Sequence, residues 1–294
     1  MAGTGSIGAV VVAYGQKLSQ IEVLVEEMRR DCVKEIVVVD NSSLVACERV
    51  VKSDEFSYTV VSTGKNLGFG RAVNLGISYL PKCSYLVISN PDISITSPVV
   101  CELVKVLEKS SHVALIAPKI LTPSGERYPS VRRFPSTFVS FVHGFLGLFW
   151  RDNPISKWYR MDDIDLDRPL SAPWVSGAFF VVRSSSFRQV GGFDPKYFLY
   201  CEDVDLCDRL ERSHFEVVYY PRVSVVHYQG ASSALRPLFS LYHHHRSMWL
   251  FAKSKNSPQP LLMLEALGIG CRFLGSALVR VVFSGVQSTR KSIT

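Results

Sequence analysis

The sequence predicts an α/β fold in which a mostly parallel sheet is flanked by helices and followed by a helical C-terminal segment. Over roughly the first 120 residues, short β-branched runs alternate with stretches whose apolar residues recur at helical spacing. This alternation is typical of βαβ units, whose consecutive strands pair in parallel. After Pro258 and Pro260 the chain becomes rich in Leu, Val and Gly, which predicts a separate C-terminal helix.

The first half of the chain contains short apolar runs with the length and composition of buried strands. These predicted strands are Ile7–Ala13, Lys34–Val39, Tyr58–Ser62, Tyr85–Ser89 and Val113–Ala117. The predicted helices between them are Leu18–Arg30, a helix that ends near Tyr79, and Ser97–Lys109. Later segments with the same kinds of signal are a strand over Trp174–Arg183, a serine-capped helix over Ser184–Val190, strands over Val217–Tyr220 and Val223–Val226, and the C-terminal helix over Leu261–Val286.

Length and composition suit one large domain with an appendage. The chain has 294 residues, of which 47% are hydrophobic and 20% are charged, so a sizeable core is available. We expect a main domain over residues 1–235, divided into a first half (1–120) and a second half (121–235). Residues 236–294 would form the C-terminal helical region.

The balance of charge and the cysteines constrain the partners and the compartment. The formal net charge of +7 favours phosphates or acidic lipids, and the absence of a long basic run argues against nucleic acid. Seven scattered cysteines without a C-x-x-C pair predict reduced thiols, most of them buried, in a reducing compartment.

Polar residues follow three successive predicted strands, at the edge where sheets of this class bind ligands. The clusters are Asp40–Asn41, Asn66 to Arg71 with Gly68 and Gly70, and Asn90 to Asp92. Each suits part of a nucleotide: a carboxylate for ribose or base, a glycine turn with an arginine for phosphate, and a carboxylate for a divalent cation. For any one loop, simple turn formation is the alternative, because Asp, Asn and Gly are good turn formers.

An acidic triplet lies in an otherwise apolar and aromatic stretch. Glu202, Asp203 and Asp205 open an apparent helix, and buried carboxylates need a cation, a metal or a proton to balance them. The alternative is that the three residues simply interact favourably with the helix dipole. His227 ends a predicted strand nearby, so its ring nitrogen is a candidate metal ligand.

Two apolar segments point toward a membrane. Phe138–Trp150 is too short to span a bilayer and could be core, a lid or a membrane-dipping segment. In the C-terminal helix, Glu265, Arg272, Ser276 and Arg280 fall on one narrow arc, which favours an amphipathic helix at the membrane surface. Packing of this helix on the domain is the alternative.

Taken in chain order, the motifs resemble those of the inverting GT-A glycosyltransferases of family two. The motifs are V-V-A-Y, V-D-N-S-S, N-L-G-F-G-R-A-V-N-L-G, S-N-P-D, W-V-S-G-A, G-G-F-D-P-K-Y-F-L-Y-C-E-D-V-D-L-C-D-R-L and V-V-H. The resemblance covers about Ile7 to Lys253. It implies that residues 1–120 form the nucleotide-binding half and residues 121–235 the acceptor and catalytic half. Within the family, Y-P-S-V-R-R-F-P-S and F-W-R-D-N-P are similar to the actinobacterial rhamnosyltransferases that extend polyprenyl-diphospho-N-acetylglucosamine.

The resemblance implies roles for residues at the matching positions. Asp203 would be the catalytic base, with Glu202, Asp205 and Trp174 supporting the acceptor or the catalytic loop. Asp92 and His227 would hold Mg²⁺ or Mn²⁺, although Asn90 replaces the first carboxylate of the family's D-x-D motif. The nucleotide sugar would contact Ala13, Tyr14, Asp40, Asn41, Asn66, Gly68, Gly70, Arg71, Asn90 and Gly177.

The resemblance also implies the substrates. The donor would be dTDP-L-rhamnose, and the acceptor would be polyprenyl-diphosphate-linked N-acetylglucosamine, at the cytoplasmic face of the cell membrane. The product would belong to the linker between peptidoglycan and arabinogalactan. Three alternatives stay open: a related glycosyltransferase that uses a UDP-sugar, a non-catalytic protein that binds sugar nucleotides, and a sugar-nucleotide pyrophosphorylase. The last should carry a Gly-rich basic signature after its first strand, where this chain has Val12–Gln16.

Overall fold

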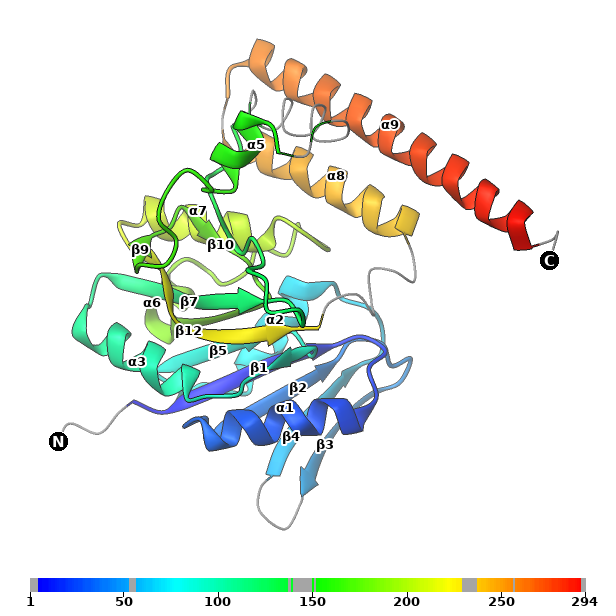
Figure 1. The fold of residues 1–294 in the computed structure, drawn as a ribbon. Coiled ribbons are helices and arrows are strands. Elements are labelled where there is room, and N and C mark those ends of the chain that lie inside the picture. Colours follow the sequence, from blue (N-terminus) through cyan, green and yellow to red (C-terminus); the bar gives the residue numbers. More distant parts are fainter. Residues whose placement is uncertain are drawn as a thin grey trace.

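A mixed sheet runs through the centre of the protein, with helices on both faces (Figure 1). The computed structural model describes residues 5–52, 57–136, 139, 150, 152–228, 237–255 and 257–291. The sheet strands, in spatial order, are β3 (Ala46–Lys52), β4 (Ser57–Thr63), β2 (Glu35–Asp40), β1 (Ile7–Ala13), β5 (Tyr85–Ser89), β11 (Phe179–Arg183), β7 (Val113–Leu121), β12 (Glu216–His227) and β6 (Ile93–Ser94). A short strand, β9 (Leu170–Ser171), also pairs with β12, and β8 (Val131–Arg132) pairs with β10 (Trp174–Val175) in a separate ribbon.

The helices divide between the two faces because the strands are apolar on both sides. The helices are α1 (Leu18–Arg30), α2 (Phe69–Ser78), α3 (Val99–Lys109), α5 (Pro154–Tyr159), α6 (Ser184–Gln189), α7 (Glu202–Arg212), α8 (Pro237–Ser254) and α9 (Gln259–Lys291). One core joins α1 and α3 to side chains such as Val11, and the other joins α2, α6 and α7 to side chains such as Val10. This alternation is the pattern of strands that are buried on both faces.

The expected α/β class with flanking helices is confirmed, and the sheet is mixed in detail. β4, β2, β1 and β5 run parallel, as the alternating pattern predicts. β11 then enters antiparallel between β5 and β7, and β3 forms an antiparallel edge. β3 was not predicted, because most of its side chains are exposed and several are charged.

Three expected elements differ in the second half. The expected strand over Trp174–Arg183 is divided between β10 and β11, because Ser176 and Gly177 turn the chain between them. The two expected strands after Glu216 form one long strand, β12, with a register irregularity between Tyr220 and Ser224. No side chain caps α6, so the expected serine cap is wrong.

Two cysteines are paired, contrary to the expectation of free thiols. Cys32, just after α1, forms a disulfide with Cys101 in α3. Beside it, the buried carboxylate of Asp31 accepts hydrogen bonds from the first-turn N–H groups of Val100 and Cys101. The expectation that most thiols are buried is also wrong, because Cys47 and Cys271 are exposed. The disulfide and Asp31 together fix α1 against α3.

The C-terminal helices α8 and α9 lie side by side at one end of the domain (Figure 1). Within the described residues, Gln259–Leu278 is the one helical stretch long and apolar enough to cross a membrane, judged by length and composition alone. Exposed apolar side chains recur at intervals of three, seven and four residues along it and form one stripe: Leu264, Leu267, Leu274 and Leu278. The polar arc, with Glu265 and Arg272, is half-buried instead. The apolar segment Phe138–Trp150 lies outside the described residues except for Val139 and Trp150.

A close backbone contact joins the two halves of the domain. Phe69 N–H donates to the carbonyl oxygen of Phe198 at 3.1 Å, and a Cβ added to Gly68 would lie 2.1 Å from the same oxygen. Gly68 also has φ 84° and ψ 169°, a conformation that is essentially restricted to glycine. The loop that leads into α7 can therefore pack on the start of α2 only if residue 68 is glycine.

We expect Gly68→Ala to lower the free energy of unfolding by about 3 kcal/mol or more, since backbone strain and overpacking add. Gly15→Ala is the matched control, because Gly15 also has positive φ (81°) but no atom within 4 Å of its added Cβ. The control should lose only about 1–2 kcal/mol. Urea unfolding of both variants checks this, and equal losses would contradict the steric argument.

Candidate functional site

The main cavity has a volume of about 800 Å³ and lies at the carboxyl ends of β1 and β5. One side is formed by the strand-end loops that carry Tyr14, Asn41, Asn66 and Asp92. The other side is formed by β8, β10, the loop before α7, and helices α8 and α9. Glu202 and Asp203 line the cavity where α7 begins. Both sides enclose one continuous space, which has room for two ligands side by side.

Asp203 is held in one orientation by backbone donors. Gly177 N–H donates to Oδ2 of Asp203 at 2.9 Å, and Val204 N–H donates to Oδ1 at 2.9 Å. Burial raises the pKa of Asp203, while these two hydrogen bonds and the nearby Arg132 guanidinium oppose the rise. A carboxylate with a raised pKa that remains ionised is a stronger proton acceptor, as a general base must be.

Glu202 is the neighbour that keeps its proton. Its side chain is 6% exposed, and burial together with the negative charge of Asp203 raises its pKa to about 8. Its Oε2 has no hydrogen-bond partner among the described residues. Two adjacent carboxyl groups in one buried site rarely ionise together, so the environment assigns the charge to Asp203 and the proton to Glu202.

The chain enters α7 through two strained residues. Tyr200 and Cys201 both have positive φ, 68° and 63°. Such consecutive left-handed residues cost about 1–3 kcal/mol each and are found where the surrounding structure imposes them, often at functional sites. The turn brings the first residues of α7, Glu202 and Asp203, to the cavity wall.

Asp205, the third acidic residue, has a structural environment. It is buried outside the cavity lining and accepts hydrogen bonds from Tyr197 Oη at 3.1 Å, Arg209 Nε at 2.7 Å and Lys196 Nζ at 3.3 Å. These contacts fix the 194–201 loop against α7. The expected supporting role for Asp205 therefore concerns the loop and not the acceptor.

Asp92 and His227 meet at the opposite side of the cavity. His227 Nε2 lies 3.0 Å from Asp92 Oδ1 and 3.4 Å from Asn90 Nδ2. Tyr228 N–H donates to the Asp92 carbonyl, and β6 pairs with β12 directly beyond, so the geometry is anchored on both strands. The expected metal-site residues are therefore brought together.

This pair fits a divalent cation that a diphosphate helps to bind. The carboxylate oxygen and the imidazole nitrogen lie 3.0 Å apart in the cavity lining, and both are ligand types that Mg²⁺ or Mn²⁺ accepts. With a single carboxylate, most coordination positions would be left for phosphate oxygens and water. His227 is buried, and its Nδ1 has no partner among the residues that the structure describes.

The strand-end amides line the cavity but also organise their own loops. Asn41 Nδ2 donates to Asn66 Oδ1 at 3.0 Å, and Asn41 Oδ1 accepts from Leu67 N–H at 2.8 Å. Asp40 lies outside the cavity lining and accepts from the backbone and side chain of Ser42. A nucleotide contact by Asp40 stays a prediction that this geometry does not support.

The Gly68–Gly70 turn is not free to bind a phosphate. The N–H groups of Leu67, Gly68 and Phe69 already donate to Asn41, Asn66 and Phe198. A Cβ on Gly70 would lie 2.9 Å from the Phe193 side chain, so this glycine permits helix packing. Arg71 Nε donates to the Pro195 carbonyl at 2.8 Å and does not line the cavity. Gly68 lines the cavity, and a phosphate contact by Gly68, Gly70 or Arg71 stays a prediction that these contacts do not support.

Four further expected residues have mixed outcomes. Tyr14 and Trp174 line the cavity, and Trp174 Nε1 donates to the Arg133 carbonyl at 2.8 Å. Ala13 is buried behind the lining. Gly177 lines the cavity and its N–H donates to the Asp203 carboxylate, while a sugar contact by Gly177 stays a prediction.

Four cavity residues outside the strand-end loops were not predicted, whereas the arginine at position 132 was expected to suit a diphosphate. The four are Tyr159, Phe198, His244 and Arg272, which come from α5, the loop before α7, α8 and α9. They share no spacing or motif, because they converge only when the helices α8 and α9 pack over the cavity. The sequence did contain one signal for Arg272, its place on the polar arc of the apolar C-terminal helix. That signal predicted only that the helix lies at a membrane surface.

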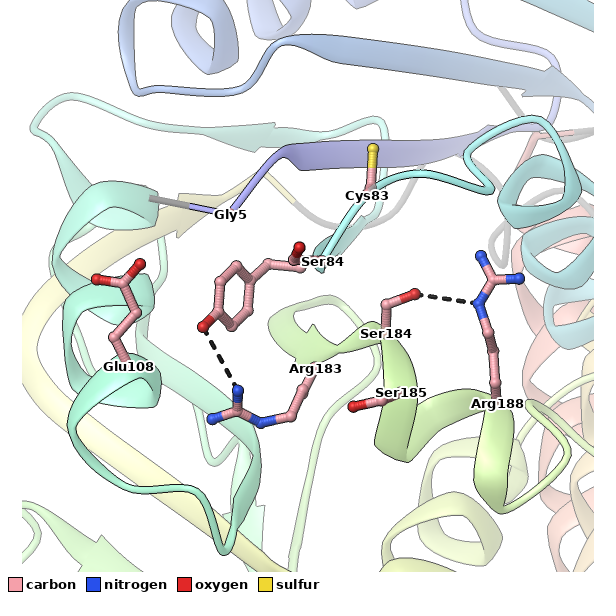
Figure 2. A pocket seen from close by; sticks show the side chains of 9 residues that line it. Gly5, Cys83, Ser84, Glu108, Arg183, Ser184, Ser185 and Arg188 are labelled. Carbon is pink, nitrogen blue, oxygen red and sulfur yellow. Dashed lines mark hydrogen bonds between the residues drawn. The ribbon is translucent and has the colours of Figure 1, made fainter. Parts of the chain in front are cut away.

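A second cavity, of about 520 Å³, lies at the opposite end of the sheet, beside Gly5 and the start of β5 (Figure 2). Its arginines serve the fold: Arg183 donates to the carbonyls of Leu107 and Ser110 and to Tyr85 Oη. Arg188 donates to Ser184 Oγ at 3.1 Å and to the Leu80 carbonyl. Both guanidinium groups donate hydrogen bonds to carbonyl groups at the ends of helical segments, so their role is structural. The main cavity therefore remains the candidate site.

Comparisons with known proteins agree with this assignment. Residues 9–191 match the glycosyl transferase family 2. The N-acetylglucosaminyl-diphospho-decaprenol L-rhamnosyltransferase of Mycobacterium tuberculosis is 33% identical over 233 residues, which are 76% of this chain and 75% of that protein. The rhamnosyltransferase WbbL of Escherichia coli K12 is 28% identical over 228 residues, which are 74% of this chain and 82% of that protein.

A solved structure confirms the expected GT-A fold. The mannosyltransferase PcManGT from Pyrobaculum calidifontis, in complex with GDP-Man and Mn²⁺, has a TM-score of 0.55 to this chain. The match covers 97% of this chain and 81% of that chain at 14% sequence identity. At this identity the likeness shows the fold alone.

The Glu202 pKa predicts how stability depends on pH. Because the folded-state pKa of about 8 lies above the ordinary value of 4.5, the folded protein binds the proton more tightly than the unfolded chain. Glu202 therefore destabilises the fold progressively as pH rises from about 5 to above 8, by a few kcal/mol at most. Thermal unfolding of wild type and Glu202→Gln from pH 5.5 to 9 checks this. The variant should gain stability relative to wild type as pH rises, and parallel curves would contradict the assignment.

Proposed function

The chain belongs to glycosyl transferase family 2, and we propose that it is an inverting rhamnosyltransferase that uses dTDP-L-rhamnose and polyprenyl-diphospho-N-acetylglucosamine. The observation that carries the reaction type is the main cavity, whose lining includes Asp203 as well as the strand-end loops. The sugar and the acceptor rest on the likeness to two rhamnosyltransferases, one of which is named for a lipid-diphosphate acceptor. The product would enter the arabinogalactan linker, at the cytoplasmic face of the membrane.

The geometry favours a single displacement. Asp203 would accept the proton of an acceptor hydroxyl while that oxygen forms a bond to the anomeric carbon of the donor. The bond from this carbon to the diphosphate breaks on the opposite side, so the configuration inverts and dTDP leaves. Glu202 stays neutral beside Asp203, which avoids a second negative charge next to the base.

Asp92 and His227 would hold a divalent cation against the donor diphosphate. Such an ion stabilises the charge that develops on the leaving group. Asn90, within 3.4 Å of His227, would keep the imidazole oriented toward Asp92. Support comes from the convergence of these three side chains at one wall of the cavity.

The C-terminal helix would place the enzyme on the membrane as a peripheral protein. The exposed stripe of Leu264, Leu267, Leu274 and Leu278 would enter the lipid interface, while Glu265 and Arg272 face the protein. A lipid-linked acceptor would then reach the cavity from the membrane side.

A panel of donors and acceptors tests the proposal directly. The full-length protein is incubated with dTDP-L-rhamnose, UDP-glucose, UDP-galactofuranose or GDP-mannose, each with a short-chain lipid diphospho-N-acetylglucosamine. We expect transfer from dTDP-L-rhamnose, and little transfer to free N-acetylglucosamine. Product from another donor only would refute the sugar, and binding of nucleotide sugars without any transfer would favour a non-catalytic protein.

Asp203→Asn should reduce turnover by roughly 10²–10⁴-fold, because the amide cannot accept the proton. Binding of the donor, measured by titration, should be retained. Asp205→Asn is the contrasting variant: it loses contacts to Lys196 and Arg209 outside the cavity, so we expect a lower melting temperature but a much smaller loss of turnover. Turnover near wild type in Asp203→Asn would remove the residue from the catalytic role.

Removal of divalent cations with EDTA should weaken donor binding and turnover, and added Mg²⁺ or Mn²⁺ should restore both. Asp92→Ala and His227→Ala should each raise the metal concentration needed for half-maximal rate by about tenfold or more. If EDTA leaves activity intact, the pair contacts the diphosphate directly through His227 and holds no metal.

A further inference from the structure

We call the part of the cavity formed by β8, β10, α5, α8 and α9 the acceptor side. The C-terminal helix contributes the side chain of Arg272 to it. Arg272 lies on α9, yet its side chain lines the cavity together with His244 and Met248 of α8. The residue before it, Cys271, is exposed on the outer face of the same helix. Arg272 therefore points inward from a helix whose apolar stripe points outward.

Arg272 has no anionic partner in the described part of the fold. Among the residues that the structure describes, no carboxylate forms an ion pair with it, whereas Arg133, Arg160 and Arg209 are all paired. A half-buried guanidinium without a counter-ion has lost hydration without compensation. Burial accordingly lowers the pKa of Arg272. A cation in this position favours an anionic ligand in the cavity.

Arg272 is one end of a connected set that begins at the proposed base. Arg132 is electrostatically coupled to Asp203, and its guanidinium carbon lies 6.0 Å from the ring centre of Tyr159 and 5.3 Å from that of Trp174. Tyr159 interacts electrostatically with both Arg132 and Arg272, and all of these residues line the same cavity. Arg132 couples to Asp203 and Arg272 does not, so from Asp203 the two guanidinium groups follow in the order Arg132 and Arg272.

This order matches the order of groups in a lipid-linked sugar. The sugar hydroxyl must reach Asp203, the diphosphate follows the sugar, and the lipid follows the diphosphate. Beyond Arg272, α9 carries the exposed side chains Leu267, Leu274 and Leu278. Guanidinium groups bind phosphate oxygens through paired hydrogen bonds, which an ammonium group cannot reproduce in the same geometry.

We propose that Arg132 and Arg272 bind the diphosphate of the acceptor, with Arg132 on the phosphate next to the sugar and Arg272 on the phosphate next to the lipid. The assignment rests on the proposed lipid-diphosphate acceptor. It gives α9 a second role, because the helix that contacts the membrane also completes the acceptor site.

Steady-state kinetics of Arg272→Gln test this. The acceptors are a short-chain, water-soluble lipid diphospho-N-acetylglucosamine and an analogue that joins the same sugar and lipid without phosphates. We expect the KM for the diphosphate acceptor to rise about tenfold or more, with the KM for the donor and the kcat at saturation within about twofold. The preference of wild type for the diphosphate acceptor over the analogue should largely disappear, and Arg272→Lys should restore part of it.

Lys253→Gln is the matched control, since Lys253 is an exposed cation on α8 that does not line the cavity. Lys253→Gln removes one positive charge, as Arg272→Gln does, so it should reproduce any loss of general attraction to anionic lipid. It should leave the KM for the donor and the KM for the diphosphate acceptor unchanged. Binding to vesicles with and without phosphatidylglycerol separates the two sources of phosphate. If Arg272→Gln weakens only vesicle binding, Arg272 contacts a lipid headgroup and the proposal is overturned.

A binding measurement separates failure of the proposed diphosphate site from failure of the proposed transfer reaction. In the presence of saturating dTDP, farnesyl diphosphate should raise the melting temperature of wild type but not of Arg272→Gln, and farnesyl monophosphate should act less. If wild type transfers no sugar but this dependence on Arg272 is seen, the diphosphate site stands and the transfer reaction is wrong. If wild type is active and the variant has unchanged kinetics and unchanged binding, the site is wrong and the reaction stands.

Discussion

The free energy of burying Glu202 and Asp203 is the constraint on which the rest of the site depends. Two adjacent carboxyl groups at a cavity wall are costly unless one keeps its proton and the other has donors. The N–H groups of Gly177 and Val204 donate hydrogen bonds to Asp203, and the Arg132 guanidinium interacts with its charge. These interactions offset the cost of burying the carboxylate. The split between β10 and β11 brings the Gly177 N–H to Asp203, and the left-handed pair Tyr200–Cys201 turns the chain into α7. Local irregularities of the backbone thus produce the electrostatic environment of Asp203, the proposed base.

Most of the first 120 residues could be predicted from the sequence, because the buried strands and the helices there have strong local signals. β1, α1 and β5 have the bounds that their apolar patterns predict, since these segments are buried against helices from either side. The elements that were missed have no such pattern: β3 is an exposed edge, and β6, β8 and β9 are only two residues long. Their pairing is decided by partners that are distant in the chain.

The roles of individual residues were harder to predict than their positions. Asp203, Asp92 and His227 line the cavity as expected, because a carboxylate or an imidazole in apolar surroundings is costly to bury and is seldom retained without a ligand or a partner. The glycine at position 68 is required by close packing against the backbone of Phe198, and sequence cannot separate a glycine that admits a ligand from one that admits the chain itself. The same ambiguity applies to Arg71, whose partner is a carbonyl 124 residues away. Arg272 could not be assigned because its helix folds back over the cavity.

The position of α9, with its apolar stripe outward and Arg272 inward, has a kinetic consequence. If α9 lies on the membrane and the acceptor is lipid-linked, as proposed, the enzyme meets its acceptor by lateral diffusion in two dimensions. The relevant acceptor concentration is then a surface density, in molecules per lipid, and dilution with inert lipid would slow the reaction even at constant bulk concentration. The soluble donor would still follow ordinary bulk saturation, because its side of the cavity, with Asp92 and His227, is formed by the main domain. The reaction rate would thus depend on the surface density of the acceptor but on the bulk concentration of the donor, although both bind in one cavity.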